Sequence, residues 1–251
     1  MKGSVRQIAV LVVGAVLVAG PAHADQVRVL SSVALKTVIE ALAPEFARTS
    51  KHSIAPEFGI AAALKTRMEG GEPFDVAILT PAMLDDLVSK GLIDAASRPV
   101  VARSGLGLMV KAGSPKPDLR SVEALKRTLL AARSITYVPT GASGVLFLAT
   151  LDKLGIADAV KAKAKTAASG DEVNQNITSG AADLAVLPVS EILPVAGAEL
   201  GGVFPAEIQS YIVMAAGINP RSPKAAAARE FVTFITSAKA TPVVKAKGME
   251  R

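Results

Sequence analysis

The chain has 251 residues, half of them hydrophobic, with a formal net charge of +6 and no cysteine. This length suits one large or two modest domains, and the lack of cysteine excludes disulfides, thiol catalysis and cysteine-ligated metals. Only two histidines, His23 and His52, are present, which argues against a histidine-rich metal site and against a serine–histidine–aspartate triad. Aromatic residues make up 4% of the chain, so neither sugar stacking nor a platform for single-stranded nucleic acid is expected.

The positive charge is mild and dispersed along the chain. Basic residues are interspersed with acidic ones, and the alternating lysines between residues 161 and 165 are typical of a solvated surface. This balance favours a small anionic ligand and gives no indication of a nucleic-acid partner. We expect no metal and no cofactor, and the chain has no GxxxxGK[ST] phosphate loop.

Residues 1–24 have the pattern of a secretory signal peptide. Lys2 and Arg6 precede an apolar run at residues 8–19, which is too short to span a membrane comfortably. The tripeptide that ends at Ala24 has the small-x-small pattern of a cleavage site. We therefore predict cleavage after Ala24 and a soluble product in the periplasm.

From residue 25 onward, short apolar segments alternate with patterns of helical spacing. Such alternation predicts parallel sheets with helices on both faces. Ligands on sheets of this kind bind beyond the carboxyl ends of the strands. The expected strands are Val27–Leu30, Ser53–Phe58, Asp75–Leu79, Leu106–Val110, Ser134–Val138, Asp183–Leu187 and Tyr211–Ala215.

The first strand is followed by a turn with the character of an anion site. Val27–Leu30 runs into Ser31 and Ser32, and an apolar pattern with helical spacing starts directly at Val33. This arrangement points free backbone N–H groups and the positive end of a helix dipole at one place. The alternative is that Ser31 or Ser32 only caps the helix.

Similar turns recur at the ends of later strands. Gly59 and Ile60 end the second strand, Thr80 ends the third, and residues 139–144 follow a strand in the second half of the chain. The last segment has two glycines, two hydroxyls and a following helix N-terminus, although an ordinary tight turn has the same composition. The candidate ligand-binding residues are Ser31, Ser32, Gly59, Ile60, Thr80, Thr140, Ser143 and, as a basic candidate, Arg103; Lys65 and Arg67 are weaker basic candidates.

The pattern changes near Ala102, and a polar, proline-rich turn follows at residues 111–118. We predict that residues 25–103 together with 206–251 form lobe I and that residues 104–205 form lobe II. In this arrangement each lobe is a mostly parallel sheet flanked by helices, and the strand ends of both line a ligand cleft between them.

The order of segments resembles that of a type II periplasmic solute-binding protein, and within that class the molybdate-binding protein family. VRVLSSVAL at residues 27–35, the segment LKTRMEGGEPFDVAILTPAMLDDLVSKGLID at 64–94 and ADLAVLPVSEI at 182–192 carry the resemblance over nearly the whole mature chain. It implies a monomeric, exported protein that closes its lobes around a small anion and delivers it to a membrane transporter.

Several hydroxyls of the molybdate binders are missing from this chain. Those proteins have a serine just before a leucine in the first turn, where this chain has Ala34 and Leu35. Their second turn is rich in serine, whereas Gly59–Ala63 has no hydroxyl, and a tyrosine after the late strand is replaced here by Leu187 or Pro188. A tetrahedral oxyanion needs several hydroxyl and N–H donors, so we expect an organic di- or tricarboxylate in place of molybdate.

An enzyme on the same scaffold is the alternative, because some proteins that resemble this family are aconitate isomerases. Their reaction shifts a proton across an allylic carboxylate system, which needs a positioned base and stabilisation of the developing charge but no cofactor. Without a usable histidine or cysteine, the base would be a carboxylate, a lysine or a tyrosine. Tyr137, Lys65 and Tyr211 are candidates, and none has a diagnostic spacing, so the catalytic residue stays unassigned.

Overall fold

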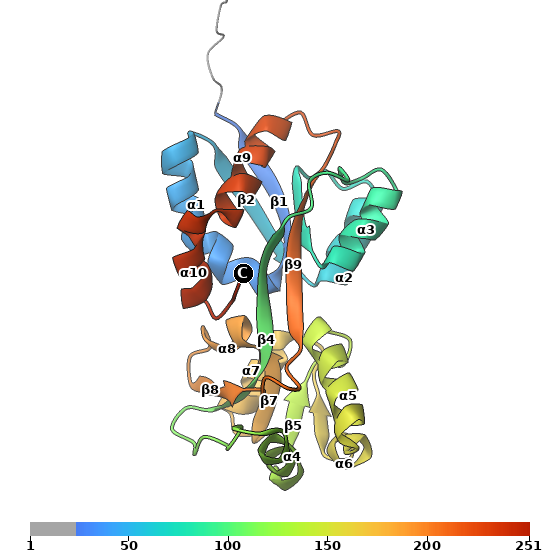
Figure 1. The fold of residues 1–251 in the computed structure, drawn as a ribbon, viewed down its shortest axis with the longest axis vertical. Helices are drawn as coiled ribbons and strands as arrows, with labels where there is room; N and C mark the ends of the chain where they lie inside the picture. The colour runs from blue at the N-terminus through green and yellow to red at the C-terminus, as the bar shows by residue number, and fades with distance from the viewer. Residues whose placement is uncertain (1–23) are drawn as a thin grey trace, which may run out of the picture.

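The computed structural model describes residues 24–251, which form two α/β lobes arranged along the long axis of the molecule (Figure 1). The predicted signal peptide, apart from Ala24, lies outside the described residues. Within residues 24–251, no helix combines the length and the hydropathy needed to cross a lipid bilayer.

Strands and helices alternate along most of the chain, as the short apolar runs predict. The strands are β1 (Gln26–Ser32), β2 (Ser53–Gly59), β3 (Val76–Leu79), β4 (Val100–Lys111), β5 (Ile135–Tyr137), β6 (Ala164–Thr166), β7 (Leu184–Pro188), β8 (Ala198–Val203) and β9 (Tyr211–Ile218). The helices are α1 (Lys36–Ser50), α2 (Ala61–Glu69), α3 (Pro81–Ser89), α4 (Val122–Ala131), α5 (Ala142–Leu154), α6 (Ala157–Lys161), α7 (Gly170–Thr178), α8 (Val189–Ile192), α9 (Ala225–Thr236) and α10 (Thr241–Ala246). Two 3-10 turns, η1 (Val33–Leu35) and η2 (Ala238–Ala240), complete the described elements.

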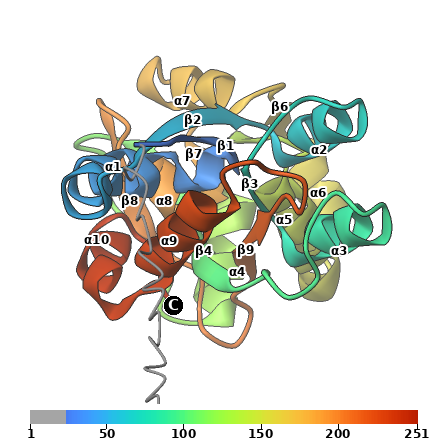
Figure 2. The same ribbon diagram turned by 90° about the horizontal axis from the view of Figure 1, so that it is seen from above.

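One strand order runs through both lobes, β2-β1-β3-β9-β4-β7-β5-β6, with β8 added on β4. In lobe I, the upper lobe of Figure 1, β1 pairs in parallel with β2 and β3, and β9 joins β3 antiparallel. Helices α1, α9 and α10 lie on one side of this sheet and α2 and α3 on the other (Figure 2). In lobe II, β5 pairs in parallel with β6 and β7. The two-lobed α/β fold with helices on its sheets is thus confirmed, and the sheets are mixed, because β9 and β4 pair antiparallel with their neighbours.

Strand β4 crosses from one lobe to the other without a break (Figure 1). As far as Gly105 it pairs with β9 in lobe I, and from Leu106 onward it pairs with β7 and β8 in lobe II. We propose that the lobes divide at this switch, close to the boundary between residues 103 and 104 that the sequence predicts.

The register on β9 sets the direction of the parallel strands in lobe I. Tyr211, at the start of β9, lies opposite Gly105 at the crossing, and β9 then runs away from lobe II as far as Ile218. Strand β3 runs antiparallel to β9, and its last residue, Leu79, lies opposite Ala215. The carboxyl ends of β3, β1 and β2 therefore point toward lobe II.

The register on β4 sets the corresponding direction in lobe II. The last residue of β7, Pro188, lies opposite Leu106, directly beside the crossing. Because β5 and β6 run parallel to β7, the carboxyl ends of all three strands point toward lobe I. The strand ends of both lobes consequently face one another, which is where ligands bind on sheets of this kind.

Buried aromatic pairs fix helices on each lobe. In lobe I, the Phe46 ring of α1 packs edge-on against Phe231 of α9, with the ring centroids 5.2 Å apart. In lobe II, Tyr137 of β5 packs against Phe147 of α5 at 5.1 Å, and Phe204 packs against Phe147 with the ring centroids 6.3 Å apart. Such pairs add to the burial of large apolar areas, so the helices that begin at the strand ends are held firmly on their sheets.

Several details differ from the sequence-based expectation. Strand β4 begins six residues before the expected Leu106, and β8 was not predicted. Ser31 and Ser32 belong to β1, because the pairing with β2 continues until Ser32 lies opposite Gly59. Helix α5 begins at Ala142, three residues earlier than expected, so Ser143 lies in its first turn. The short strand β6 was not predicted, because its three partly or fully exposed residues carry no hydrophobic period.

Asp75 joins the start of β3 to two other parts of lobe I. Its side chain is buried, with one oxygen accepting the Arg28 backbone N–H at 2.7 Å and the other accepting the Ser222 hydroxyl at 2.6 Å. Lys224 Nζ lies 3.8 Å from the carboxylate and is the nearby positive charge. The buried carboxylate thus ties β1, β3 and the segment before α9 together.

We expect Asp75→Ala to lower the free energy of unfolding by about 3 kcal/mol, because it leaves a backbone N–H and a hydroxyl buried without acceptors. Urea denaturation of the mature chain measures the change. Asp152→Ala, at an exposed position within α5, is the matched control and is expected to be close to neutral. An equal loss in both variants would contradict the role given to Asp75.

Candidate functional site

The first strand end carries two buried hydroxyls. Ser31 is fully buried, and its hydroxyl donates to the Ser32 carbonyl oxygen at 3.1 Å. The Ser32 hydroxyl accepts the backbone N–H of Ala34 at 3.4 Å and so caps η1. The Ser32 side chain therefore acts as a helix cap, which is the alternative that the sequence left open. The backbone N–H groups of this turn still lie at the interlobe edge of β1.

The second and third strand ends lead into helices that lack a side-chain cap. Ile60 is the N-cap residue of α2 and Thr80 that of α3, and neither side chain accepts a hydrogen bond from its helix. The first turn of a helix has N–H groups without partners inside the helix, and they carry the positive end of its dipole. Ile60 is 53% exposed and Gly59 precedes it, so this edge of lobe I is apolar apart from its backbone.

The loop between β5 and α5 supplies the corresponding edge of lobe II. Gly141 is the N-cap residue of α5, Ser143 is buried in its first turn, and Thr140 is exposed. A Cβ at Gly144 would overlap the carbonyl oxygen of Val138. The first turn of α5 therefore lies directly on the end of β5, and only glycine permits this approach.

Two further features of lobe II lie near the site and were not assigned to it from the sequence, although a helix at residues 172–179 was expected. Helix α7 begins after β6 with a capping box, in which Ser169 accepts the Glu172 N–H at 3.2 Å while Glu172 accepts the Ala168 N–H at 2.7 Å. The Ser-x-x-Glu spacing is a recognised signal for such a start. Helix α8 follows β7 and carries Glu191, for which the sequence has no signal beyond one acidic residue after a buried strand.

Glu191 is an acidic side chain without a counterion. Helix α8 lies beside η1 of lobe I, and a Cβ built on Gly170, the first residue of α7, would lie 3.8 Å from Glu191 Oε2. Within the described chain, the Glu191 carboxylate takes part in no ion pair and accepts no hydrogen bond. Glu191 is half-buried, and this burial raises its pKa to about 7, because the ionised form loses part of its contact with water.

The basic candidates have their charges matched within lobe I. Arg103 pairs with Glu250 at 2.9 Å and lies 4.3 Å from the centre of the Tyr211 ring. Lys65 pairs with Glu69 at 2.6 Å, and Arg67 donates to two glutamates of its own lobe. Each of these cations is therefore already paired with an acid of its own lobe.

The candidate bases lie in different surroundings. Tyr137 is buried in the core of lobe II, and burial raises the pKa of its phenol above the ordinary value. Tyr211 stacks under Arg103, and Lys65 is held by its ion pairs. Glu191, with a pKa of about 7, is suited to exchange a proton near neutral pH.

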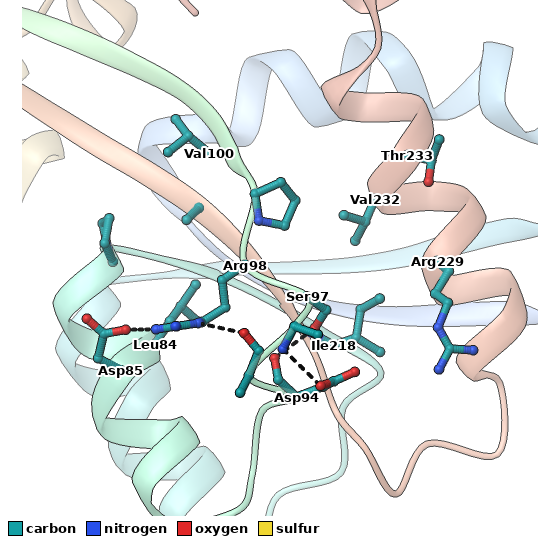
Figure 3. Close-up of a pocket in the computed structure, with 15 residues that line it drawn as sticks. Leu84, Asp85, Asp94, Ser97, Arg98, Val100, Ile218, Arg229, Val232 and Thr233 are labelled. Atoms are coloured by element: carbon teal, nitrogen blue, oxygen red, sulfur yellow. Dashed lines mark hydrogen bonds and ion pairs between the residues drawn. The ribbon is translucent and has the colours of Figure 1, made fainter.

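A cavity of about 740 Å³ lies elsewhere, on lobe I, between α3, the start of β4 and α9 (Figure 3). Arg98 pairs with Asp85 at its edge, and Arg229 extends from α9. None of the predicted ligand residues lines this cavity. We place the candidate site at the facing strand ends instead, because the helix starts of both lobes converge there.

The family model described as bacterial extracellular solute-binding protein matches residues 27–250. The chain belongs to this family. A search among known proteins finds it 27% identical over 250 residues to the aconitate isomerase of a Pseudomonas species, covering 96% of this chain and 95% of that protein. It is also 27% identical over 243 residues to the molybdate-binding protein ModA of Azotobacter vinelandii, covering 95% of each.

Solved structures of solute-binding proteins share the fold. The periplasmic molybdate-binding protein of Azotobacter vinelandii matches with a TM-score of 0.74 at 23% identity, covering 90% of this chain and 99% of that one. The substrate-binding domain of a putative molybdenum ABC transporter from Clostridium difficile matches with a TM-score of 0.76 at 18% identity, covering 91% and 99%. The predicted resemblance to this family is confirmed.

We expect Gly144→Ala to lower the free energy of unfolding by about 2 kcal/mol, because the added methyl group overlaps the Val138 carbonyl and must push α5 off β5. Urea denaturation measures the loss. Gly141→Ala, in the same loop, brings its Cβ no closer than 3.4 Å to Val138 and serves as the control. Equal stability of the two variants would show that α5 does not lie this close to the strand.

The raised pKa of Glu191 predicts a pH-dependent stability. Below the pKa that Glu191 has in the unfolded chain, its carboxyl is protonated in both the folded and the unfolded state. Between that pKa and about 7, only the unfolded state loses this proton. The wild-type chain therefore becomes less stable as the pH rises through this window. Melting temperatures of wild type and Glu191→Gln are expected to agree near pH 4, with the variant higher at pH 8; parallel curves across this range would contradict the raised pKa.

Proposed function

We propose that this protein is a periplasmic carrier that binds a small organic anion, a di- or tricarboxylate, between its lobes. It is exported by a signal peptide cleaved after Ala24, acts as a monomer and delivers its ligand to a membrane transporter. The observation that carries the proposal is the set of helix starts at the facing strand ends, which offers backbone N–H groups from both lobes but few hydroxyls.

Backbone groups, not cations, account for the anion preference. Helix N-termini bind carboxylates through free N–H groups and the helix dipole. Helices α2 and α3 in lobe I and α5 in lobe II have no side-chain cap that occupies these groups. Since Arg103 and Lys65 are already paired with acids, the ligand charge is balanced mainly by the N–H groups.

The few hydroxyls favour a carboxylate over molybdate. The start of α2, at Ile60 and Ala61, presents no hydroxyl to the interlobe edge. A tetrahedral oxyanion has four oxygens that each need donors, whereas a carboxylate ligand also brings a carbon skeleton that packs against the exposed Ile60 side chain. Apolar side chains at the site therefore weaken the binding of an organic acid less than the binding of molybdate.

Thermal denaturation of residues 25–251 with a panel of anions tests this proposal. Citrate, cis-aconitate and trans-aconitate are compared with molybdate, tungstate and sulfate. A ligand at a hundred times its dissociation constant stabilises the fold by about 2.7 kcal/mol. We expect shifts with one or more of the carboxylates; a shift with molybdate or tungstate alone would overturn the organic-anion assignment.

A charge substitution locates the site within the protein. Thr140→Glu places a negative charge at the start of α5 and is expected to abolish the ligand-dependent shift. Ala226→Glu, at an exposed position in the first turn of α9, adds the same charge away from the strand ends and is expected to keep the shift. Loss of the shift in both variants, or in neither, would contradict the interlobe site.

An aconitate isomerase is the second candidate, favoured by Glu191 and by the Pseudomonas relative. A general base is most effective when its pKa lies near the working pH, and the pKa of Glu191 is about 7. In this reaction the base removes a proton from the methylene carbon of aconitate, the double bond shifts, and the proton returns to the former vinylic carbon. Proton NMR of trans-aconitate tests it, because turnover produces the separate signals of cis-aconitate. In heavy water, the product carries deuterium wherever the protonated base exchanges with solvent before it returns the proton.

A further inference from the structure

Glu191 lies where the two lobes meet. Strand β7 ends opposite Leu106 at the crossing, and α8 follows without a loop. Helix α8 contacts η1 of lobe I, the turn that follows Ser31 and Ser32. It also packs on β4, β7 and β8 of lobe II. Glu191 is thus carried by the one short helix that lies between the strand ends of lobe I and the sheet of lobe II.

No positive charge neutralises Glu191. Among the elements packed on α8, η1 and β7 have no titratable side chain. On β4, Arg103 is taken by Glu250, and Lys111 lies exposed at the far end of the strand. On β8, Glu199 pairs with Lys116. The segment at Gly248, which lies against α8, carries Lys247, and within the described residues no ion pair joins this lysine to Glu191. The first turn of α7 adds two acids, Asp171 and Glu172, the latter occupied by the Ala168 N–H. The surroundings therefore favour the neutral form of the Glu191 carboxyl.

Two polar atoms without partners lie on the same pair of helices. Within residues 24–251, the buried side-chain nitrogen and oxygen atoms that lack a hydrogen bond are Ser190 Oγ and Asn174 Oδ1. Ser190 adjoins Glu191 on α8, and Asn174 lies one helical turn beyond Gly170, the residue that faces Glu191 Oε2. Buried polar groups are normally satisfied, so an unpaired atom beside Glu191 on α8 and another on the neighbouring α7 mark this region as one that lacks a polar partner.

We propose that Glu191 is a ligand-contacting residue of the anion site and that its neutral carboxyl donates a hydrogen bond to a carboxylate oxygen of the ligand. This inference rests on the proposed carrier function. An ionised Glu191 would repel the anion, whereas a neutral one acts as a donor at a site that is poor in hydroxyls. Binding is therefore accompanied by the uptake of one proton from solvent whenever Glu191 is ionised in the free protein.

The uptake of a proton predicts the pH dependence of affinity. Above the pKa of Glu191 in the free protein, the dissociation constant rises about tenfold for each pH unit, because the fraction of neutral carboxyl falls by that factor. Ligand carboxyls are ionised throughout this range and do not contribute. Because the pKa of free Glu191 is about 7, the rise begins near neutral pH.

Calorimetric titration of residues 25–251 with trans-aconitate between pH 6 and pH 9 tests the proposal. Measurements in two buffers of different ionisation enthalpy count the protons taken up. We expect wild type to bind about tenfold more weakly at pH 9 than at pH 8, with proton uptake approaching one. Glu191→Gln keeps a hydrogen-bond donor without a titratable group, so its affinity is expected to be independent of pH, with no proton uptake.

Glu123→Gln is the matched control, because Glu123 is exposed on α4 in lobe II; it should behave as wild type. The same pH dependence in wild type and Glu191→Gln would overturn the role of Glu191 and leave the carrier function intact. If no anion of the panel binds wild type, the carrier function itself fails. Should Glu191→Gln not fold, the carboxyl carbon NMR signals of wild type decide, since ligand is expected to raise the pKa of one glutamate above 7 and an unchanged set would contradict the proposal.

Discussion

The pairing of β4 with strands of both lobes is the constraint on which the site depends. Gly105 is the last residue of β4 that pairs with β9, and Leu106 is the first that pairs with β7. Strand β3 runs antiparallel to β9, and β7 runs antiparallel to β4. The carboxyl ends of all the parallel strands therefore point at the crossing. Helix starts on both lobes face each other for this reason, although no single motif in the chain specifies it.

A site built from helix starts explains how a protein with paired surface cations can hold an anion. Backbone N–H groups at the starts of α2, α3 and α5 are set by the fold and need no particular side chain. Side chains are then free to select the ligand, and here they are mostly small or apolar. Glu191 is the exception, an acid among donors for anions, and its neutral form resolves the conflict because it adds a further donor.

The sequence predicts the two-lobed fold and where its strands end, whereas the ligand-binding residues stay a prediction. Alternating apolar runs and terminal small residues identify the strand ends, because backbone geometry requires such residues there; Ser31 and Thr80 were found in this way. Two features depend on tertiary packing and carry no local signal. Arg103 resembles a ligand residue in sequence but is paired with Glu250, which is far along the chain. Glu191 resembles an ordinary helix residue, and only the fold shows that it lies half-buried beside η1 without an ion-pair partner.

A crystal structure of residues 25–251 grown with trans-aconitate tests the central claim most directly. The account predicts the ligand between the lobes, with its carboxylates at the starts of α2 and α5 and one oxygen within hydrogen-bond distance of Glu191. Ligand bound in the lobe I cavity beside Arg98 and Arg229, with the strand ends empty, would contradict it.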